Sequence, residues 1–167
     1  MWWFNKKIAL CITMALMLAG CKLINIDQFE NQVNTEIGSV AVIDTAGRAG
    51  QLYSRALRRA LYTKGQSIMV YDLYSSISVT SSSALSVKGF TSTFKKMTMV
   101  ISFSLKNQKT NKVLLSDSVT ADTTLGSTSS LFGQDQSESH ASDRMAKLLA
   151  QRVVQRLQLY FLNNPEK

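Results

Sequence analysis

The side chain with the clearest chemical use in this chain is Cys21, one of its two cysteines. It directly follows Leu18-Ala19-Gly20 and closes an apolar stretch at residues 8–19, which comes after Lys6 and Lys7. A basic start, a short apolar stretch and small residues before a cleavage point are typical of a secretory signal peptide. At 1.5 Å per residue the stretch spans about 18 Å of helix, too short for a hydrocarbon core of about 30 Å. A signal peptide is therefore favoured over the alternative, a transmembrane anchor.

The segment that ends at Cys21 resembles a bacterial lipobox, in which the signal is cut before the cysteine and the cysteine is acylated. The resemblance implies that residues 1–20 are removed and that Cys21 becomes a lipidated N-terminus. Because each buried methylene contributes about 0.8 kcal/mol, two or more acyl chains would anchor the protein stably to a membrane. Cys11 leaves with the signal, so the mature chain has no thiol for a disulfide, a redox pair or a nucleophile.

Residues that could form a catalytic site are sparse. His140 is the one histidine of the chain, which excludes an HExxH zinc motif and leaves a Ser-His-Asp set only that residue. The carboxylates are scattered without a paired spacing, and the glycines of residues 45–50 lack the spacing and the Lys-Ser/Thr of a phosphate-binding loop. We therefore expect a protein that is not an enzyme and that has no catalytic residues, metal site or cofactor.

The charge balance favours an anionic partner. The 19 basic residues fall to 17 when Lys6 and Lys7 leave with the signal, which against 11 acidic residues gives a mature charge of +6. A basic surface attracts phosphate-bearing lipids, nucleic acids and polyanionic sugars. Secretion argues against nucleic acid as the partner.

The basic residues are concentrated where acidic residues are missing. No Asp or Glu lies between Asp72 and Asp117. The same segment carries six lysines: Lys88, Lys95, Lys96, Lys106, Lys109 and Lys112. One interpretation is that these lysines protect exposed strands from edge-to-edge pairing. The other is a surface for a phosphate-bearing ligand.

Arginines form a second basic group on a predicted helix at residues 46–64. At 100° per residue four of them share the polar face, opposite an apolar face: Arg48, Arg55, Arg58 and Arg59. They could simply be solvated. Because arginine suits buried ion pairs better than lysine, they are also candidates for docking onto a protein partner.

The remaining patterns predict an α+β fold in which two helices pack on one face of a four-stranded, mostly antiparallel sheet. Strands are predicted at 39–44, 71–80, 94–106 and 113–123, and helices at 46–64 and 137–162, which gives the order β-α-β-β-β-α. Residues 107–112 are short and polar enough to close an antiparallel hairpin, and residues 126–136 form a predicted loop.

Details of the predicted helices follow from their end residues and periodicity. Asp44 or Thr45 can cap the first helix. The buried stripe of the second consists of Ala146, Leu149, Ala150, Val153, Leu157 and Phe161. The predicted organisation is a removed signal (1–20), a lipidated cysteine with a tether (21–38), one domain (39–163) and a short tail (164–167).

Together these features resemble the LptE family of lipopolysaccharide-assembly lipoproteins, over about residues 39–162. The segments that carry the resemblance are AGRAGQLYSRAL (46–57), YDLYSSISV (71–79), KGFT (88–91), KVLLS (112–116), ASDRMA (141–146) and RVVQRL (152–157). The resemblance implies two helices against a four-stranded sheet, which agrees with the pattern of elements.

The resemblance also implies a role at the outer membrane. Proteins of this family plug the large β-barrel LptD, help it to assemble and bind lipopolysaccharide. Lys88 matches the basic residue that the family places at the tip of the hairpin between the second and third strands. A second basic position is expected before the last helix, where residues 126–136 have none. Lys95 and Lys96 are the candidates to substitute for it.

Two other functions stay open at this stage. The chain could be a lipoprotein adaptor subunit of another envelope lipid-transport complex. An envelope hydrolase is disfavoured by the single histidine and by the missing nucleophile motif. The residue after Cys21 is Lys22, whereas an Asp commonly retains lipoproteins at the inner membrane. We therefore expect the periplasmic side of the outer membrane, reached through the acyl chains.

Overall fold

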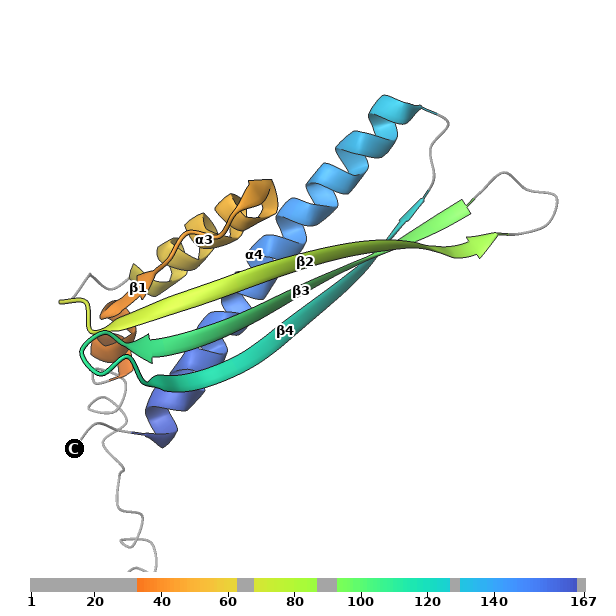
Figure 1. The fold of residues 1–167 in the computed structure, drawn as a ribbon. Helices are drawn as coiled ribbons and strands as arrows, with labels where there is room; N and C mark the ends of the chain where they lie inside the picture. The colour runs from red at the N-terminus through yellow and green to blue at the C-terminus, as the bar shows by residue number, and fades with distance from the viewer. Residues whose placement is uncertain (1–32, 63–67, 87–92, 127–129, 165–167) are drawn as a thin grey trace, which may run out of the picture. The chain divides into compact units, whose positions relative to one another are not determined.

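The computed structural model describes residues 33–62, 68–86, 93–126 and 130–164, which form one α+β unit (Figure 1). A short helical segment at 33–38 precedes the main elements. These elements are β1 (Val40–Val42), α3 (Gly47–Leu61), β2 (Tyr71–Ser86), β3 (Thr93–Asn107), β4 (Val113–Gly126) and α4 (Leu131–Asn163). The predicted order β-α-β-β-β-α is confirmed.

The strands lie in the sheet in the order β1-β2-β3-β4. β1 is parallel to β2, with Val40 opposite Tyr71, whereas β2, β3 and β4 are antiparallel neighbours. The predicted hairpin between β3 and β4 is present. The Asn107 side chain closes its turn by accepting hydrogen bonds from the backbone N–H groups of Lys109 and Thr110, at 3.0 and 3.1 Å. The sheet is therefore mostly antiparallel, as predicted.

Both helices cover the same face of the sheet (Figure 1). Alternation along β3 buries five side chains on that face: Met97, Met99, Ile101, Phe103 and Leu105. The helix α3 adds Tyr53, Leu57 and Leu61. Every residue of the stripe predicted for α4 is buried. The core therefore lies between one face of the sheet and the two helices.

Three elements extend clearly beyond their predicted ends: β2 and β4 end later, β4 at Gly126, and α4 begins earlier. β2 continues to Ser86 because its serine-rich end pairs with β3, with an irregularity between Ser83 and Leu85. α4 begins at Leu131, so the predicted loop at 126–136 is wrong over its second half. The Ser130 side chain accepts a hydrogen bond from the Gly133 N–H at 3.3 Å, which caps the helix before its buried face begins.

The residues before β1 belong partly to the folded unit. Ile37 is buried, and the Tyr71 hydroxyl donates a hydrogen bond to the Glu36 carboxylate at 3.0 Å. The short helix at 33–38 therefore packs on the unit, so the prediction of a tether is wrong for these residues; residues 21–32 lie outside the described residues. In the described ranges, no helix combines the length and the apolar character that a membrane crossing needs.

Candidate functional site

The candidate residues predicted from the sequence lie in separate places. The arginines are on α3, and Lys95 and Lys96 are at the start of β3, where β2, β4 and α4 also begin or end (Figure 1). Cys21 and Lys88 lie outside the described residues. The structure therefore offers two basic regions to compare.

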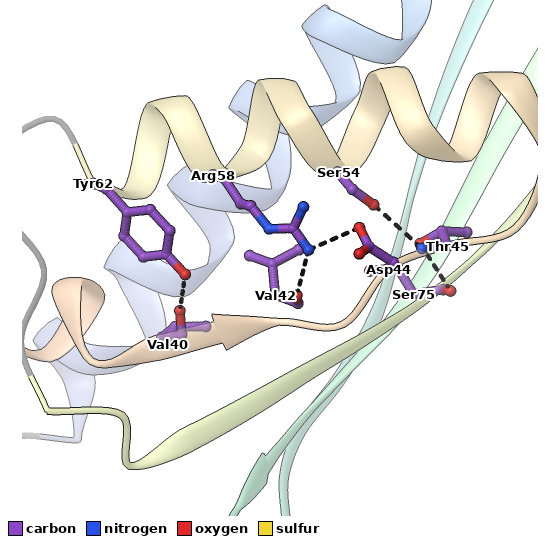
Figure 2. Close-up of polar contacts among 8 residues, drawn as sticks. All are labelled: Val40, Val42, Asp44, Thr45, Ser54, Arg58, Tyr62 and Ser75. Carbon is purple, nitrogen blue, oxygen red and sulfur yellow. Dashed lines mark hydrogen bonds and ion pairs between the residues drawn. The ribbon is translucent and has the colours of Figure 1, made fainter.

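On α3, Arg58 faces the edge strand β1 (Figure 2). Its Nη2 donates to the Val42 carbonyl at 3.0 Å and to Asp44 Oδ1 at 2.7 Å. One turn further along, the Tyr62 hydroxyl donates to the Val40 carbonyl at 2.9 Å. These donors satisfy the Val42 and Val40 carbonyls of β1, which is the edge strand of the sheet. Arg58 therefore holds α3 and β1 together, whereas Arg48, Arg55 and Arg59 are exposed.

The turn into α3 is held by residues distant in sequence (Figure 2). Ser54 Oγ accepts a hydrogen bond from the Thr45 N–H, and Thr45 Oγ1 donates to the Ser75 carbonyl, both at 3.3 Å. The predicted cap is therefore wrong: the N-cap is Ala46, without a side-chain hydrogen bond. Asp44 and Thr45 do not cap the helix because they bond to Arg58 and to β2 instead.

Beneath this turn, the Tyr53 hydroxyl lies 3.1 Å from Ser75 Oγ. Burial raises the pKa of Tyr53 to about 12, against the opposing effect of that hydrogen bond. Tyr53 is therefore neutral in the physiological range and acts as a core residue.

A cavity of about 520 Å³ beside the turn is lined by Gln51, Arg55 and Arg58, among others. Arg48 and Arg59 are not part of its lining.

Lys95 and Lys96 point to opposite faces of the sheet, because side chains alternate along a strand. Lys95 Nζ lies 2.7 Å from Glu138 Oε1 of α4, on the helix-covered face. Lys96 Nζ lies 3.3 Å from Asp122 Oδ2 of β4, on the open face. The acid-free segment is thus given counter-charges by α4 and β4. These partners could not be predicted from the sequence, because Glu138 and Asp122 lie far from the lysines along the chain.

Hydrogen bonds lower the pKa values of the two carboxylates that face these lysines. The hydrogen bond from Lys95, followed by one from Gln134, lowers the pKa of Glu138. The hydrogen bond with Thr98, followed by the contact with Lys96, lowers the pKa of Asp122. Both carboxylates are therefore ionised at neutral pH, and each lysine has an anionic partner that a ligand must replace.

Apolar side chains are also exposed at the ends of β3 and α4 that lie on this side of the unit. Leu131 and Phe132, at the start of α4, are 91% and 75% exposed, and Phe94 is 40% exposed. Phe94 pairs with Gly126, the last residue of β4, a few residues before α4 begins. We name Phe94, Lys95, Lys96, Leu131 and Phe132 the distal end. It combines ammonium groups with apolar surface, which suits an anionic amphiphile.

Sequence reasoning missed the apolar half of the distal end. Leu131 and Phe132 are adjacent apolar residues among small and polar ones, and only their exposure singles them out.

His140 is exposed on α4. Within the part of the chain that the structure describes, no group of His, Cys, Asp and Glu side chains could hold a metal ion.

Comparison with known proteins gives one matching family and several solved structures of similar fold. The family model described as "LptE: Lipopolysaccharide-assembly" matches residues 26–157. No curated protein matches the chain. A putative lipoprotein from Caulobacter crescentus CB15 has a TM-score of 0.64 at 18% identity, covering 80% of this chain and 98% of that chain.

Two further solved structures are similar. A minor lipoprotein from Acinetobacter baumannii has a TM-score of 0.56 at 15% identity, covering 72% of this chain and 91% of its own. The rare lipoprotein B from Shewanella oneidensis has a TM-score of 0.57 at 14% identity, covering 75% and 96%. At these identities the likeness is one of fold.

Proposed function

The chain belongs to the LptE lipopolysaccharide-assembly family, and from this premise we propose that it binds lipopolysaccharide at its distal end while docked to an LptD-like β-barrel of the outer membrane. Lipopolysaccharide carries phosphate groups on a multiply acylated lipid. The single observation that supports this ligand best is the combination of lysines with exposed Phe94, Leu131 and Phe132. Lys88, Lys95 and Lys96 are the proposed phosphate contacts.

The ion pairs of the distal end do not prevent such binding. The side chains of Lys95 and Lys96 are 36% and 48% exposed. Exposed ion pairs typically contribute only about 0–1 kcal/mol. A lipid phosphate can therefore replace Glu138 or Asp122 at little cost in free energy. Because the lysines lie on opposite faces, the proposal needs the lipid to wrap around the end of the sheet.

Reversing three charges tests the lipid site. The change of Lys88, Lys95 and Lys96 to Glu should abolish lipopolysaccharide binding at low salt, because phosphates would meet carboxylates. Wild-type binding should itself weaken between 0.1 and 1 M salt, as the Debye length falls from about 10 to about 3 Å. Binding of purified lipopolysaccharide to purified protein provides the measurement.

A matched control comes from the other end of the same acid-free segment. The change of Lys106, Lys109 and Lys112 to Glu alters the net charge equally but lies at the β3–β4 turn. This variant should keep most of its lipid binding. Equal losses in both triple variants would mean that net charge, and not the distal end, decides binding. Unchanged binding in the first variant would leave its lysines as edge protection.

We propose the exposed arginines of α3 as the docking surface for the barrel. Arg48, Arg55 and Arg59 are exposed, while Arg58 already holds β1. Changing Arg48 and Arg55 to Glu should reduce the amount of barrel that co-purifies and leave lipid binding intact. Co-purification of an inner-membrane ATPase complex in place of a barrel would favour the alternative, an adaptor subunit of another lipid transporter.

The anchor is a separate proposal. We propose that Cys21 is acylated at the N-terminus of the mature chain and holds it on the periplasmic side of the outer membrane. Changing Cys21 to Ser should remove the lipid site and leave the protein unprocessed or soluble. Mass spectrometry of protein extracted from membranes provides the measurement. An unmodified Cys21, or residues 1–20 still attached, would contradict the lipoprotein assignment.

A further inference from the structure

The outer edge of β4 is unpaired in the described part of the chain, because β4 is the last strand of the sheet. Backbone groups of an edge strand that point away from the sheet must find other partners. Two of them do so through side chains. The Thr120 carbonyl accepts a hydrogen bond from Arg152 Nη1 of α4. The Ser118 N–H donates to Asp117 Oδ1 at 2.7 Å.

These side chains stand in for a neighbouring strand. Along an antiparallel strand the outward-pointing groups belong to every second residue, which fits Ser118 and Thr120. Arg152 provides a donor where the N–H of an added strand would lie, and Asp117 provides an acceptor where its carbonyl would lie. Arg156 Nε lies 3.5 Å from Asp117 Oδ2 and completes the arrangement.

A groove follows this edge between β4 and α4. It has a volume of about 430 Å³, and its charged lining side chains are Arg152 and Arg156. Leu159 lines it as well and is 53% exposed. The Arg156 side chain is 55% exposed. The groove thus offers a strand edge that has no neighbouring strand in the described part of the chain, two guanidinium groups and an apolar side chain to one occupant.

We propose that this β4 edge binds an extended, acidic segment of a partner protein by strand addition. The N–H and carbonyl of the added strand bond to Thr120 and Ser118 and displace the Arg152 and Asp117 side chains. The freed guanidinium groups of Arg152 and Arg156 then bind carboxylates of the segment, and Leu159 covers an apolar side chain. Main-chain bonds of this kind give affinity, and the side-chain contacts give specificity. The charge of the groove selects the acidic partner.

The simpler alternative is that the two arginines only block the edge against pairing. The two roles predict opposite effects when the arginines are removed. If they bind the partner's carboxylates, their loss weakens binding of an acidic strand. If they block the edge, their loss strengthens strand pairing and promotes self-association through β4.

The test uses the full mature protein and a fluorescein-labelled peptide of alternating valine and glutamate. Fluorescence anisotropy should show saturable binding to the wild type. The double change Arg152→Ala and Arg156→Ala should weaken it about tenfold or more, which corresponds to 1.4 kcal/mol. The matched double change Arg144→Ala and Lys147→Ala, on the same helix but outside the groove, should leave binding unchanged. Hydrogen exchange should show protection of β4 amides by the peptide.

A second peptide, N-methylated at alternate residues, keeps the charges but lacks the backbone donors. It should bind about tenfold more weakly to the wild type, whether or not any variant folds. Equal binding of both peptides would reduce the contact to charge attraction and overturn strand addition. Absent binding, or stronger binding by the arginine variant, would also overturn it. So would a concentration-dependent dimer in sedimentation that the acidic peptide does not dissociate, because the occupant would then be a second copy.

Discussion

Replacing Leu149 with alanine should lower the free energy of unfolding by about 2–5 kcal/mol. Leu149 is fully buried, in the middle of the α4 stripe that packs on α3 and the sheet. The change removes apolar atoms from the core and leaves a cavity. Because α4 is packed against α3 and the sheet, its backbone cannot move to close this cavity. Because natural domains have only about 5–15 kcal/mol in total, this loss is a large part of the stability.

The adjacent residue provides the control for this prediction. Leu148 has the same side chain on the same helix but is 42% exposed. Leu148→Ala should change the free energy of unfolding by about 0.5 kcal/mol or less. Urea denaturation of both variants, with the slope of the transition compared to wild type, separates a true stability change from a changed unfolded state. Equal effects at Leu148 and Leu149 would refute the assignment of the buried face.

The parts of the fold that could be predicted from the sequence are those with one-sided patterns. Residues 97–105 alternate between apolar and polar, and the stripe of α4 recurs at helical spacing, so each pattern specified one buried face. The start of α4 could not be predicted in this way. Its first turns contact little of the core, and they depend on a cap by Ser130 and on the contact of Glu138 with Lys95.

The wrong cap of α3 has a similar cause. Asp44 and Thr45 are residue types that cap helices, and they lie at the right place in the chain. Arg58 and Ser75, distant in sequence, compete for them and form the bonds. Local propensity could not reveal this competition because it is decided by where β1 and β2 pair. The result is a turn that is fixed by tertiary contacts and not by its own residues.

The candidate lipid site was half predictable. A segment without acids was visible in the sequence, but its lysines were predicted as one surface, whereas Lys95 and Lys96 lie on opposite faces of the sheet. The partners Glu138 and Asp122 were not visible, because the register of β3 with β4 and the position of α4 bring them close. The exposed Leu131 and Phe132 were also missed, because two adjacent apolar residues do not form a periodic pattern from which a surface can be predicted.

Changing Gly50 to alanine should destabilise the protein by about 1–3 kcal/mol, the usual range for overpacking. Alanine is about 1 kcal/mol more favourable than glycine inside a helix, so propensity alone predicts the opposite sign. Gly50 is buried in α3, and a β-carbon there would lie 2.5 Å from the Thr45 carbonyl oxygen. Thr45 cannot easily move away, because Ser54 and Ser75 hold its backbone N–H and its hydroxyl.

Gly126 at the end of β4 is the matched control, because a β-carbon there would meet no atom within 4 Å. Gly126→Ala should therefore leave the midpoint of thermal unfolding nearly unchanged, whereas Gly50→Ala should lower it by about 2–4 °C for each kcal/mol lost. A Gly50→Ala variant as stable as the wild type would show that the turn yields, and that its bonds to Ser54 and Ser75 do not fix the start of α3.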